Sequence, residues 1–292
     1  MKSRPGLVFA VLLASLGLTP TVTSAATAAS APKPLRILLI TGGCCHDYAA
    51  QKDLIKDGLE ARANVIVEHL HTADKTTKPV FASHSNPDYA KGCDLVIHNE
   101  CAADISDPAM VQNVLAPHLA GLPGANLHCA MHSYRVAKDF KTPLAPGSAG
   151  AAWFDYLGLQ SSAHGPKEPI MISFTASASP ITRGLENWLT GNEELYNNVQ
   201  DPKNFPGHRS LATGQQTVTD KQGNKTDKTA VVVWTNTYGP KQARVFSTTL
   251  GHTNTTVGDP RYLDLVTRGV LWATGKLADD GRPAPGYGPK GQ

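Results

Sequence analysis

The spacing of apolar residues in the first half of the chain predicts alternating strands and helices. Residues 35–43 (LRILLITGG) form a nearly continuous aliphatic run that ends in two glycines, which is typical of a strand buried on both faces of a parallel sheet. Residues 51–63 and 107–121 carry apolar side chains at helical spacing, and the second of these helices begins with Asp107 as its cap and Pro108 at its first position. Further strands are predicted at residues 64–71, 93–100 and 125–131. This alternation predicts an α/β fold with a doubly wound parallel sheet.

The second half of the chain has a less regular pattern. Four strands and a closing helix are predicted from it, at residues 168–174, 193–198, 229–239, 243–252 and 259–277. The third and fourth of these strands are separated only by a GPKQ turn and are expected to form a hairpin. One domain is therefore expected over residues 35–277. The Gly/Pro-rich tail at 278–292 is expected to be disordered.

The first residues of the chain have the pattern of a signal peptide. A charged start with Lys2 and Arg4 precedes the apolar run 7–18, and the small residues at 23–28 allow cleavage after Ala25 or Ala28. The apolar run is shorter than the roughly 20 residues that a spanning helix needs, which disfavours the alternative of an N-terminal membrane anchor. We therefore expect a signal peptide at 1–28 and an exported protein, periplasmic or secreted, with no stable membrane anchor.

Composition narrows the possible partners and the disulfide chemistry. The chain has 292 residues, a formal net charge of +3 and no run of basic residues, so nucleic acid is not an expected partner. It has five cysteines, an odd number that leaves at least one thiol without a partner in the chain. Cys44 and Cys45 are adjacent and are not expected to pair with each other. The partners of the other cysteines and the oligomeric state stay open.

Polar side chains gather where the predicted strands end, and the carboxyl ends of parallel strands meet in one crevice where ligands bind. The residues at these ends are His46 and Asp47, then Asn99 and Glu100, then His132, Ser133 and Arg135, and finally His252 and Asn254. His98 and His128 lie inside predicted strands and are expected to be buried core histidines. The sequence therefore predicts a polar site at this edge of the sheet.

Histidines from several strand ends suit a divalent metal such as zinc, manganese or nickel. A catalytic zinc site uses three protein ligands and one open position, and His46, His132 and His252 are the predicted ligands. Glu100 or Glu194 would be a fourth ligand or a base that acts on the bound water. The metal-free alternative uses the same groups, with His132, Glu100 and Glu194 as candidate catalytic residues, in acid–base chemistry.

An ordered set of motifs resembles the ThuA-like family, which is named for trehalose utilisation. The motifs are LLITGGCCHDY, LVIHNECAAD, LHCAMHSYR, SPITRGL, EELYN, VVWTNTYGPKQARVFSTTLGH and RGVLWATGKL, and they span residues 35–277. The resemblance implies a flavodoxin-like three-layer α/β/α sandwich with a mostly parallel central sheet, similar to class I glutamine amidotransferases. It also implies a role in carbohydrate catabolism beside oxidoreductases that make 3-keto sugars, and in some members a bound metal ion.

The resemblance also assigns the family's recurring polar positions to residues of this chain. They are His46, Glu100, His132, Glu194, Tyr196 and His252, with His164 as a loop histidine. Ser179 departs from the family, whose members often carry histidine there. Arg135, Tyr196, His164 and Asn254 are the expected substrate-binding residues, for a small sugar or glycoside.

A glutaminase would need a cysteine nucleophile on a sharp turn after a strand. Family comparison puts His132 at that turn and Asn254 where the partner acid would stand. Cys129 is expected three residues before the turn, inside the strand, as a small buried packing residue. The expected function is therefore an exported enzyme that hydrolyses, eliminates or isomerises a sugar or keto-glycoside. The alternatives are a non-catalytic carbohydrate-binding or accessory protein, and a metallohydrolase with a non-sugar substrate.

Overall fold

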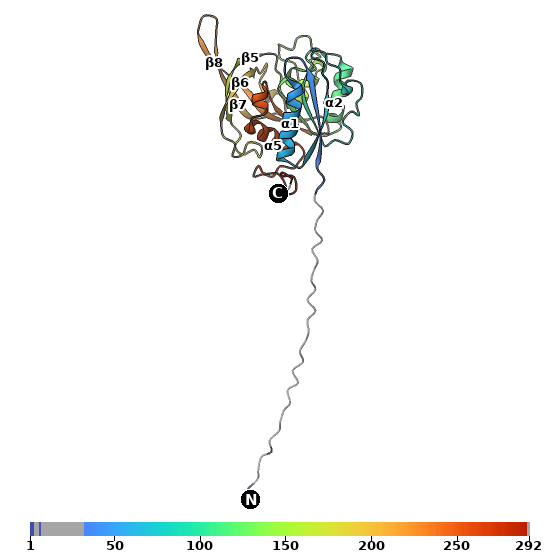
Figure 1. Ribbon diagram of the computed structural model, residues 1–292, viewed down its shortest axis with the longest axis vertical. Coiled ribbons are helices and arrows are strands. Elements are labelled where there is room, and N and C mark those ends of the chain that lie inside the picture. Colours follow the sequence, from blue (N-terminus) through green and yellow to red (C-terminus); the bar gives the residue numbers. More distant parts are fainter. Residues whose placement is uncertain (3–5, 7–31, 291–292) are drawn as a thin grey trace. The chain divides into compact units, whose positions relative to one another are not determined.

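One sheet of nine strands forms the centre of the protein in the computed structural model, which describes residues 1–2, 6 and 32–290 (Figure 1). The strand order is β2-β1-β3-β4-β9-β8-β7-β5-β6. The strands are β1 (Leu35–Gly43), β2 (Val65–His71), β3 (Leu95–Cys101), β4 (Gly124–Leu127), β5 (His164–Phe174), β6 (Trp188–Tyr196), β7 (Arg209–Thr219), β8 (Lys225–Tyr238) and β9 (Ala243–Thr248). The helices are α1 (Tyr48–Arg62), α2 (Pro108–Leu119), α3 (Ala152–Leu157), α4 (Asn254–Val257) and α5 (Pro260–Ala273), and the 3-10 turns are η1 (Ala82–His84), η2 (His128–His132), η3 (Ala149–Ala151) and η4 (Pro202–Asn204).

The sheet is mixed, which corrects the expectation of a mostly parallel one. The pairs β2–β1, β1–β3, β3–β4 and β4–β9 are parallel. The pairs β9–β8, β8–β7, β7–β5 and β5–β6 are antiparallel. Among residues 164–248, all of which the structure describes, no α-helix intervenes between strands. Turns as short as 220–224 and 239–242 cannot cross over the sheet, so consecutive strands there reverse direction.

Helices cover both faces of the sheet, and β1 has apolar side chains that pack on each face. Ile37 and Leu39 pack on one face with Ile55 of α1 and with apolar residues of α5. Ile40, which points the other way, packs in a second cluster, and α2 and α3 bury their apolar residues against that face further along the sheet. A strand buried on both faces reads as a continuous apolar run, and the predicted strand 35–43 is confirmed.

The predicted start of α2 is also confirmed. The Asp107 side chain accepts hydrogen bonds from the backbone N–H of Ala109 and of Met110, at 2.8 and 3.0 Å, and Pro108 is the first helical residue. These bonds satisfy N–H groups that have no partner inside the helix. The predicted hairpin is found as β8 and β9.

The tail after residue 277 is folded, which corrects the expected disorder for its described part, residues 278–290. Leu277 pairs with Pro283 in an isolated bridge, and the backbone N–H of Asn64 donates to the carbonyl of Tyr287. The ring of Tyr287 packs on the core beside α5. Proline and glycine here make tight turns that return the chain to the domain, so their abundance alone does not predict disorder.

The predicted signal peptide at 1–28 lies outside the described residues, apart from residues 1–2 and 6. Within the part of the chain that the structure describes, no helix is both long enough and apolar enough to span a bilayer.

Candidate functional site

The loop between β1 and α1 brings His46 to the carboxyl edge of the sheet. Gly42, Gly43 and Cys45 have φ values of +140°, +93° and +87°, and these conformations turn the chain sharply after the strand. Asp47 then caps α1 by accepting a hydrogen bond from the backbone N–H of Ala50 at 3.3 Å. His46 is therefore held between a tight turn and a helix start.

The strand β4 ends earlier than predicted, and this changes the role of His128. The strand stops at Leu127, and residues 128–132 form the turn η2. His128 follows the strand directly with a φ of +42°, so it takes the place at the sharp turn that the sequence assigned to His132. The apolar run continues into a buried turn, which hydrophobicity alone does not distinguish from a strand. His128 is buried as predicted, but it lies in the site and not inside a strand.

Three imidazoles meet at this edge: one ring nitrogen of each of His46, His128 and His252 lies within 4.8 Å of the others. Nδ1 of His46 contacts the carbonyl of His252 at 3.1 Å, and Nδ1 of His128 contacts the carbonyl of Thr249 at 2.6 Å. A carbonyl only accepts, so each of these Nδ1 atoms carries a proton, and the neutral form of either ring has its lone pair on Nε2. Backbone carbonyls fix metal-binding histidines in the same way.

The carboxylate of Glu194, on β6, completes the group. Its Oε2 lies 3.4 Å from Nδ1 of His252 and 3.6 Å from Nε2 of His128. Burial disfavours the ionised form of Glu194, but the contact with His128 and the neighbouring histidine charges outweigh it and lower the pKa to about 2. The group therefore contains an ionised carboxylate at neutral pH.

The pKa values of two of the three histidines, His46 and His252, are lowered, which favours their neutral forms. Burial, reinforced by the nearby His128 and His252, lowers the pKa of His46 to about 3, and burial also lowers the pKa of His252. Neutral imidazole is the form that binds metal. Nδ1 of His252 is buried and has no hydrogen-bond partner among the described residues, as expected of an atom reserved for a ligand. Three imidazoles and one carboxylate fit zinc, manganese or nickel.

A cavity of about 540 Å³ opens onto this group. His46, His252 and Asn254 line it, together with residues of the β1–α1 loop. The amide of Asn254 donates to Oδ2 of Asp47 at 2.9 Å, which ties the two loops together. Asn254 therefore lies at the cavity where the sequence predicted a substrate-binding residue.

His132 is not part of the three-histidine group, which corrects its predicted place as a metal ligand beside His46 and His252. Its ring stacks on Tyr196, with centroids 4.1 Å apart and planes 8° apart, and its Nε2 contacts the hydroxyl of Ser161 at 2.9 Å. The hydroxyl of Tyr196 lies 3.4 Å from Nε2 of His128. Tyr196 thus lies between His132 and the three-histidine group. His132 is at the end of η2, four residues beyond His128.

Glu100 is also placed away from the three-histidine group. Its side chain is fully buried, and Oε1 accepts from the hydroxyl of Tyr134 and contacts Nδ1 of His98, both at 2.8 Å. His98 in turn contacts His118 at 3.1 Å, so the prediction of His98 as a core histidine is confirmed. Successive residues of a strand point to opposite faces, and Glu100 points into the layer that contains α2 and α3.

Arg135 and His164 lie at separate places near Tyr196. The Arg135 guanidinium stacks on Phe140 at 4.3 Å from the ring centroid, and its Nε and Nη2 are buried with no partner among the described residues. His164 lies 3.6 Å from Oε1 of Glu194 and lines a second cavity of about 310 Å³, which Tyr196 also lines. The predicted substrate-binding residues are therefore divided between two cavities and a half-buried stack.

Glu193 is a residue that the sequence did not single out. Its side chain is fully buried, and its carboxylate accepts from the backbone N–H of His252 at 3.0 Å and of Gly251 at 3.2 Å. It thereby holds the loop that carries His252. Glu193 and Glu194 are adjacent glutamates whose side chains point to opposite faces of the strand. Their roles could have been told apart only if the bounds of that strand had been known.

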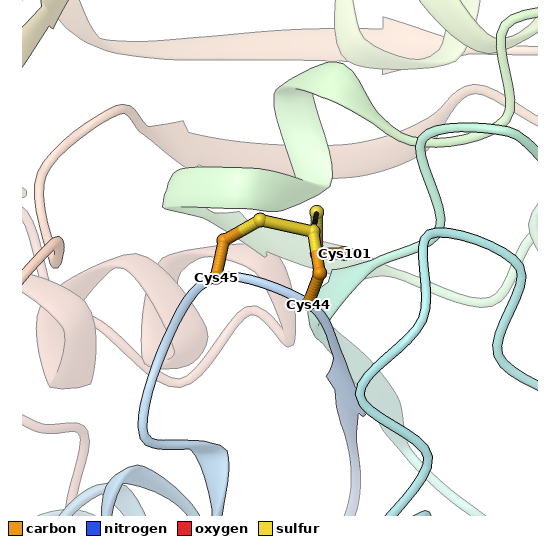
Figure 2. Close-up of side chains that lie close together, drawn as sticks. All are labelled: Cys44, Cys45 and Cys101. Carbon is orange, nitrogen blue, oxygen red and sulfur yellow. Dashed lines mark hydrogen bonds between the residues drawn. A yellow bond between two sulfur atoms is a disulfide. The ribbon is translucent and has the colours of Figure 1, made fainter.

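The cysteines near the site differ from the expectation as well. Cys44 and Cys45 form a disulfide (Figure 2), although adjacent cysteines were not expected to pair. The glycines before them and the positive φ of Cys45 give the loop the turn in which neighbouring side chains meet. Cys129 is buried as predicted, but its Sγ lies 2.9 Å from Nε2 of His46.

Comparison with known proteins gives a family and a fold. A family model described as ThuA, trehalose utilisation, matches residues 36–273. A crystal structure of a ThuA-like protein from Bacteroides uniformis is similar with a TM-score of 0.53 at 15% identity, and the match covers 84% of this chain and 95% of that one. A GMP synthase component from Thermoplasma acidophilum matches at 12% identity with a TM-score of 0.44, covering 84% of this chain and 96% of its own. The glutaminase domain of CTPS from Trypanosoma brucei, with bound acivicin, matches at 12% identity and a TM-score of 0.44, covering 87% and 99%. No curated protein matches the chain.

Proposed function

Because the chain belongs to the ThuA family of trehalose utilisation, we propose that it is an exported enzyme that acts on a sugar or keto-glycoside by hydrolysis, elimination or isomerisation. The family match supports a carbohydrate-related role. The observation that carries the reaction is the group formed by His46, His128 and His252, because imidazoles beside a cavity bind metals and transfer protons.

A divalent cation such as zinc, manganese or nickel would be held by His46, His128 and His252. When bound, such a cation supplies Lewis-acid polarisation of a substrate oxygen or of water. Glu194 is suited to be a fourth ligand, because its lowered pKa keeps the carboxylate ionised at neutral pH.

Asn254 and Asp47 would bind hydroxyl groups of the sugar. Asn254 lines the cavity and is already oriented by its hydrogen bond to Asp47 at 2.9 Å. Asp47 also lines the cavity, and its second carboxylate oxygen faces the start of α1. A pair of this kind accepts and donates hydrogen bonds without moving, which preorganises the site for a polyol.

Metal-free acid–base chemistry is the second candidate, and one contact favours it. Nε2 of His46, the atom that a metal would use, is hydrogen bonded to Sγ of Cys129 at 2.9 Å. In that version His252, which is neutral and at the cavity wall, accepts the acidic proton beside a sugar ketone.

Glutaminase chemistry is not proposed. The residue that follows β4 at the sharp turn is His128, and an imidazole cannot form the thioester that the reaction needs. Contact with Cys101 and burial raise the pKa of Cys129 well above its usual range, so its thiol stays protonated at neutral pH.

Metal content measured by plasma mass spectrometry tests the proposal. The samples are the chain without a histidine tag, His128→Ala, and His132→Ala as the matched control, each after reconstitution with zinc, manganese or nickel. Near-stoichiometric metal is expected in the chain and in His132→Ala, and its loss is expected in His128→Ala. Equal loss in both variants would contradict the assignment of His128 in place of His132. No metal in any sample would favour the acid–base version.

Turnover is then measured on trehalose and on keto-glycosides with the chain and with His252→Ala. The expected result is turnover that requires His252. Sugar binding without turnover by the chain would instead favour the non-catalytic accessory protein, and metal-dependent hydrolysis of non-sugar esters without sugar binding would favour a metallohydrolase.

A further inference from the structure

Four cysteines, Cys44, Cys45, Cys101 and Cys129, lie together beside the three-histidine group, and we name them the four-cysteine cluster. Cys44 and Cys45 are joined in a disulfide, whereas Cys101 and Cys129 are free thiols. Cys44, Cys101 and Cys129 share one small apolar contact cluster with Tyr48. Cys45 is exposed and lines the cavity that also contains His46.

The free thiol of Cys101 is directed at one sulfur of this disulfide. Sγ of Cys101 lies 3.4 Å from Sγ of Cys44 (Figure 2), and all three sulfur atoms lie within 4.8 Å of one another. The contact puts the Cys101 sulfur within reach of the disulfide, and movement of the exposed Cys45 away from Cys101 would bring the three sulfur atoms into line for thiol–disulfide exchange.

The backbone fixes this contact. Gly43 and Cys101 are partners at the ends of the parallel strands β1 and β3. A Cβ atom on Gly43 would lie 2.1 Å from the carbonyl oxygen of Cys101, so the glycine permits an approach that no other residue would allow. Cys44, the next residue, is thereby held against Cys101 by the sheet and not by a mobile loop.

We propose that the four-cysteine cluster is a site of internal thiol–disulfide exchange, in which Cys101 takes the place of Cys45 as the partner of Cys44. The Cys101 thiol gives its proton to solvent, and its sulfur attacks Sγ of Cys44. The Cys44–Cys101 bond forms as the Cys44–Cys45 bond breaks, and Cys45 leaves with the electron pair and takes a proton from solvent. Cys101 is oxidised and Cys45 is reduced, so the step needs no external oxidant or reductant.

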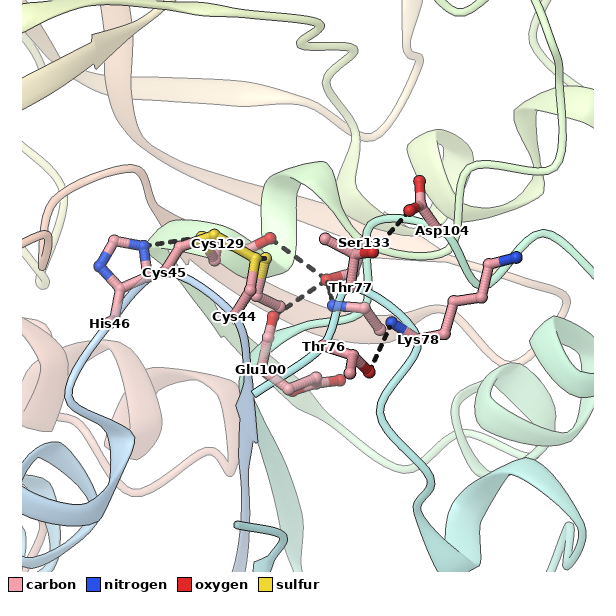
Figure 3. Close-up of a disulfide and its surroundings, with 12 residues drawn as sticks. Cys44, Cys45, His46, Thr76, Thr77, Lys78, Glu100, Asp104, Cys129 and Ser133 are labelled. Atoms are coloured by element: carbon pink, nitrogen blue, oxygen red, sulfur yellow. Dashed lines mark hydrogen bonds between the residues drawn. A yellow bond between two sulfur atoms is a disulfide. The ribbon is translucent and has the colours of Figure 1, made fainter. Parts of the chain in front are cut away.

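The exchange changes the wall of the cavity. It frees the thiol of Cys45, which already faces the cavity beside His46, and it joins the β1–α1 loop to the end of β3. Cys129, whose Sγ contacts Nε2 of His46 (Figure 3), takes no part in the exchange. The proposal does not rest on the proposed function, because it concerns the cysteines alone.

Disulfide mapping of the full chain tests the exchange. The chain is held at neutral pH for increasing times, denatured in acid, blocked with N-ethylmaleimide and digested with trypsin. Cys44 and Cys45 fall in the peptide 37–52, and Cys93, Cys101 and Cys129 fall in the peptide 92–135. The expected result is a mixture of the peptide 37–52 with its internal disulfide and a cross-linked pair of the two peptides that carries maleimide on Cys45.

Two variants identify the attacking thiol. In Cys101→Ser the cross-linked pair is expected to be lost. Cys93→Ser is the matched control, because Cys93 is a free cysteine beyond the opposite end of β3, and it should give the wild-type mixture. In the folded wild-type chain, Cys45 should also become reactive toward maleimide in step with the cross-linked pair.

Two results would overturn the proposal, and the first does not depend on the folding of any variant. It is a wild-type chain that contains only the internal disulfide, or no disulfide, at every time. The second is a cross-linked pair that persists in Cys101→Ser, which would assign the attack to Cys129 or Cys93.

Discussion

Replacement of Glu193 with glutamine should weaken the fold and the three-histidine group together. Both carboxylate oxygens of Glu193 accept from the backbone N–H of His252, at 3.0 and 3.1 Å, and one also accepts from Gly251 at 3.2 Å. In Glu193→Gln the amide oxygen can keep one donor, but the amide NH₂ then faces a second N–H that has no acceptor.

The expected loss follows from these contacts. A hydrogen bond to a charged group contributes about 1.5–3 kcal/mol, so Glu193→Gln should lower the free energy of unfolding by about that amount. For a domain of this size each kcal/mol shifts Tm by about 2–4 °C, which gives a decrease of about 3–12 °C. The loop that carries His252 should loosen, so affinity for added zinc should fall as well.

Thermal unfolding followed by circular dichroism, with zinc binding by calorimetry, measures both effects. The control is Glu194→Gln, whose carboxylate contacts the imidazoles and no backbone N–H among the described residues. It should weaken zinc binding with a smaller change in Tm. An unchanged Tm in Glu193→Gln would refute the role of Glu193 in holding the loop.

Two further predictions concern stability. Gly43→Ala should lower the free energy of unfolding in urea by more than Gly223→Ala does. Both glycines have positive φ values, +93° and +87°, but only at Gly43 would the new Cβ meet backbone, 2.1 Å from the carbonyl oxygen of Cys101. Equal losses of about 1–2 kcal/mol, the cost of the left-handed conformation alone, would contradict this prediction. Burial lowers the pKa of His118 to about 3 and of His208 to about 4. In the unfolded chain these histidines bind protons below about pH 6.5, so their contribution to the free energy of unfolding is intact above that pH. Tm should therefore fall as the pH is lowered from about 6.5 toward 4. A Tm that does not change over this range would show that neither histidine stays neutral in the folded protein.

The parts of the fold that the sequence predicted are those in which one local pattern has one structural meaning. The aliphatic run 35–43, which ends in two glycines, is typical of a strand covered on both faces, and Asp107 followed by Pro108 is typical of the start of a helix. Apart from the predicted β8–β9 hairpin, the antiparallel half of the sheet was not predicted, because strand direction depends on which strands become neighbours. The order that places β9 between β4 and β8 leaves no trace in any local window.

The candidate site was predicted in part, for a related reason. His46 and His252 follow strands whose ends were placed within a few residues, and the structure brings them together. His128 occupies the place predicted for His132 because β4 ends earlier than predicted, and strand boundaries are the least certain feature of a sequence pattern. Glu100 was misplaced because one residue along a strand decides which face a side chain occupies.

The position of β9 has a consequence for the synthesis of the protein. Among the nine described strands this one is synthesised last, yet it lies between β4 and β8 and joins the parallel half of the sheet to the antiparallel half. Until Ala243–Thr248 has emerged, β4 is an open edge that other chains can pair with. The loop with His252 follows β9 directly, so the three-histidine group cannot assemble on a nascent chain. Only a chain synthesised beyond His252 can acquire this site, and a chain that stops before Ala243 should aggregate instead of retaining partial activity.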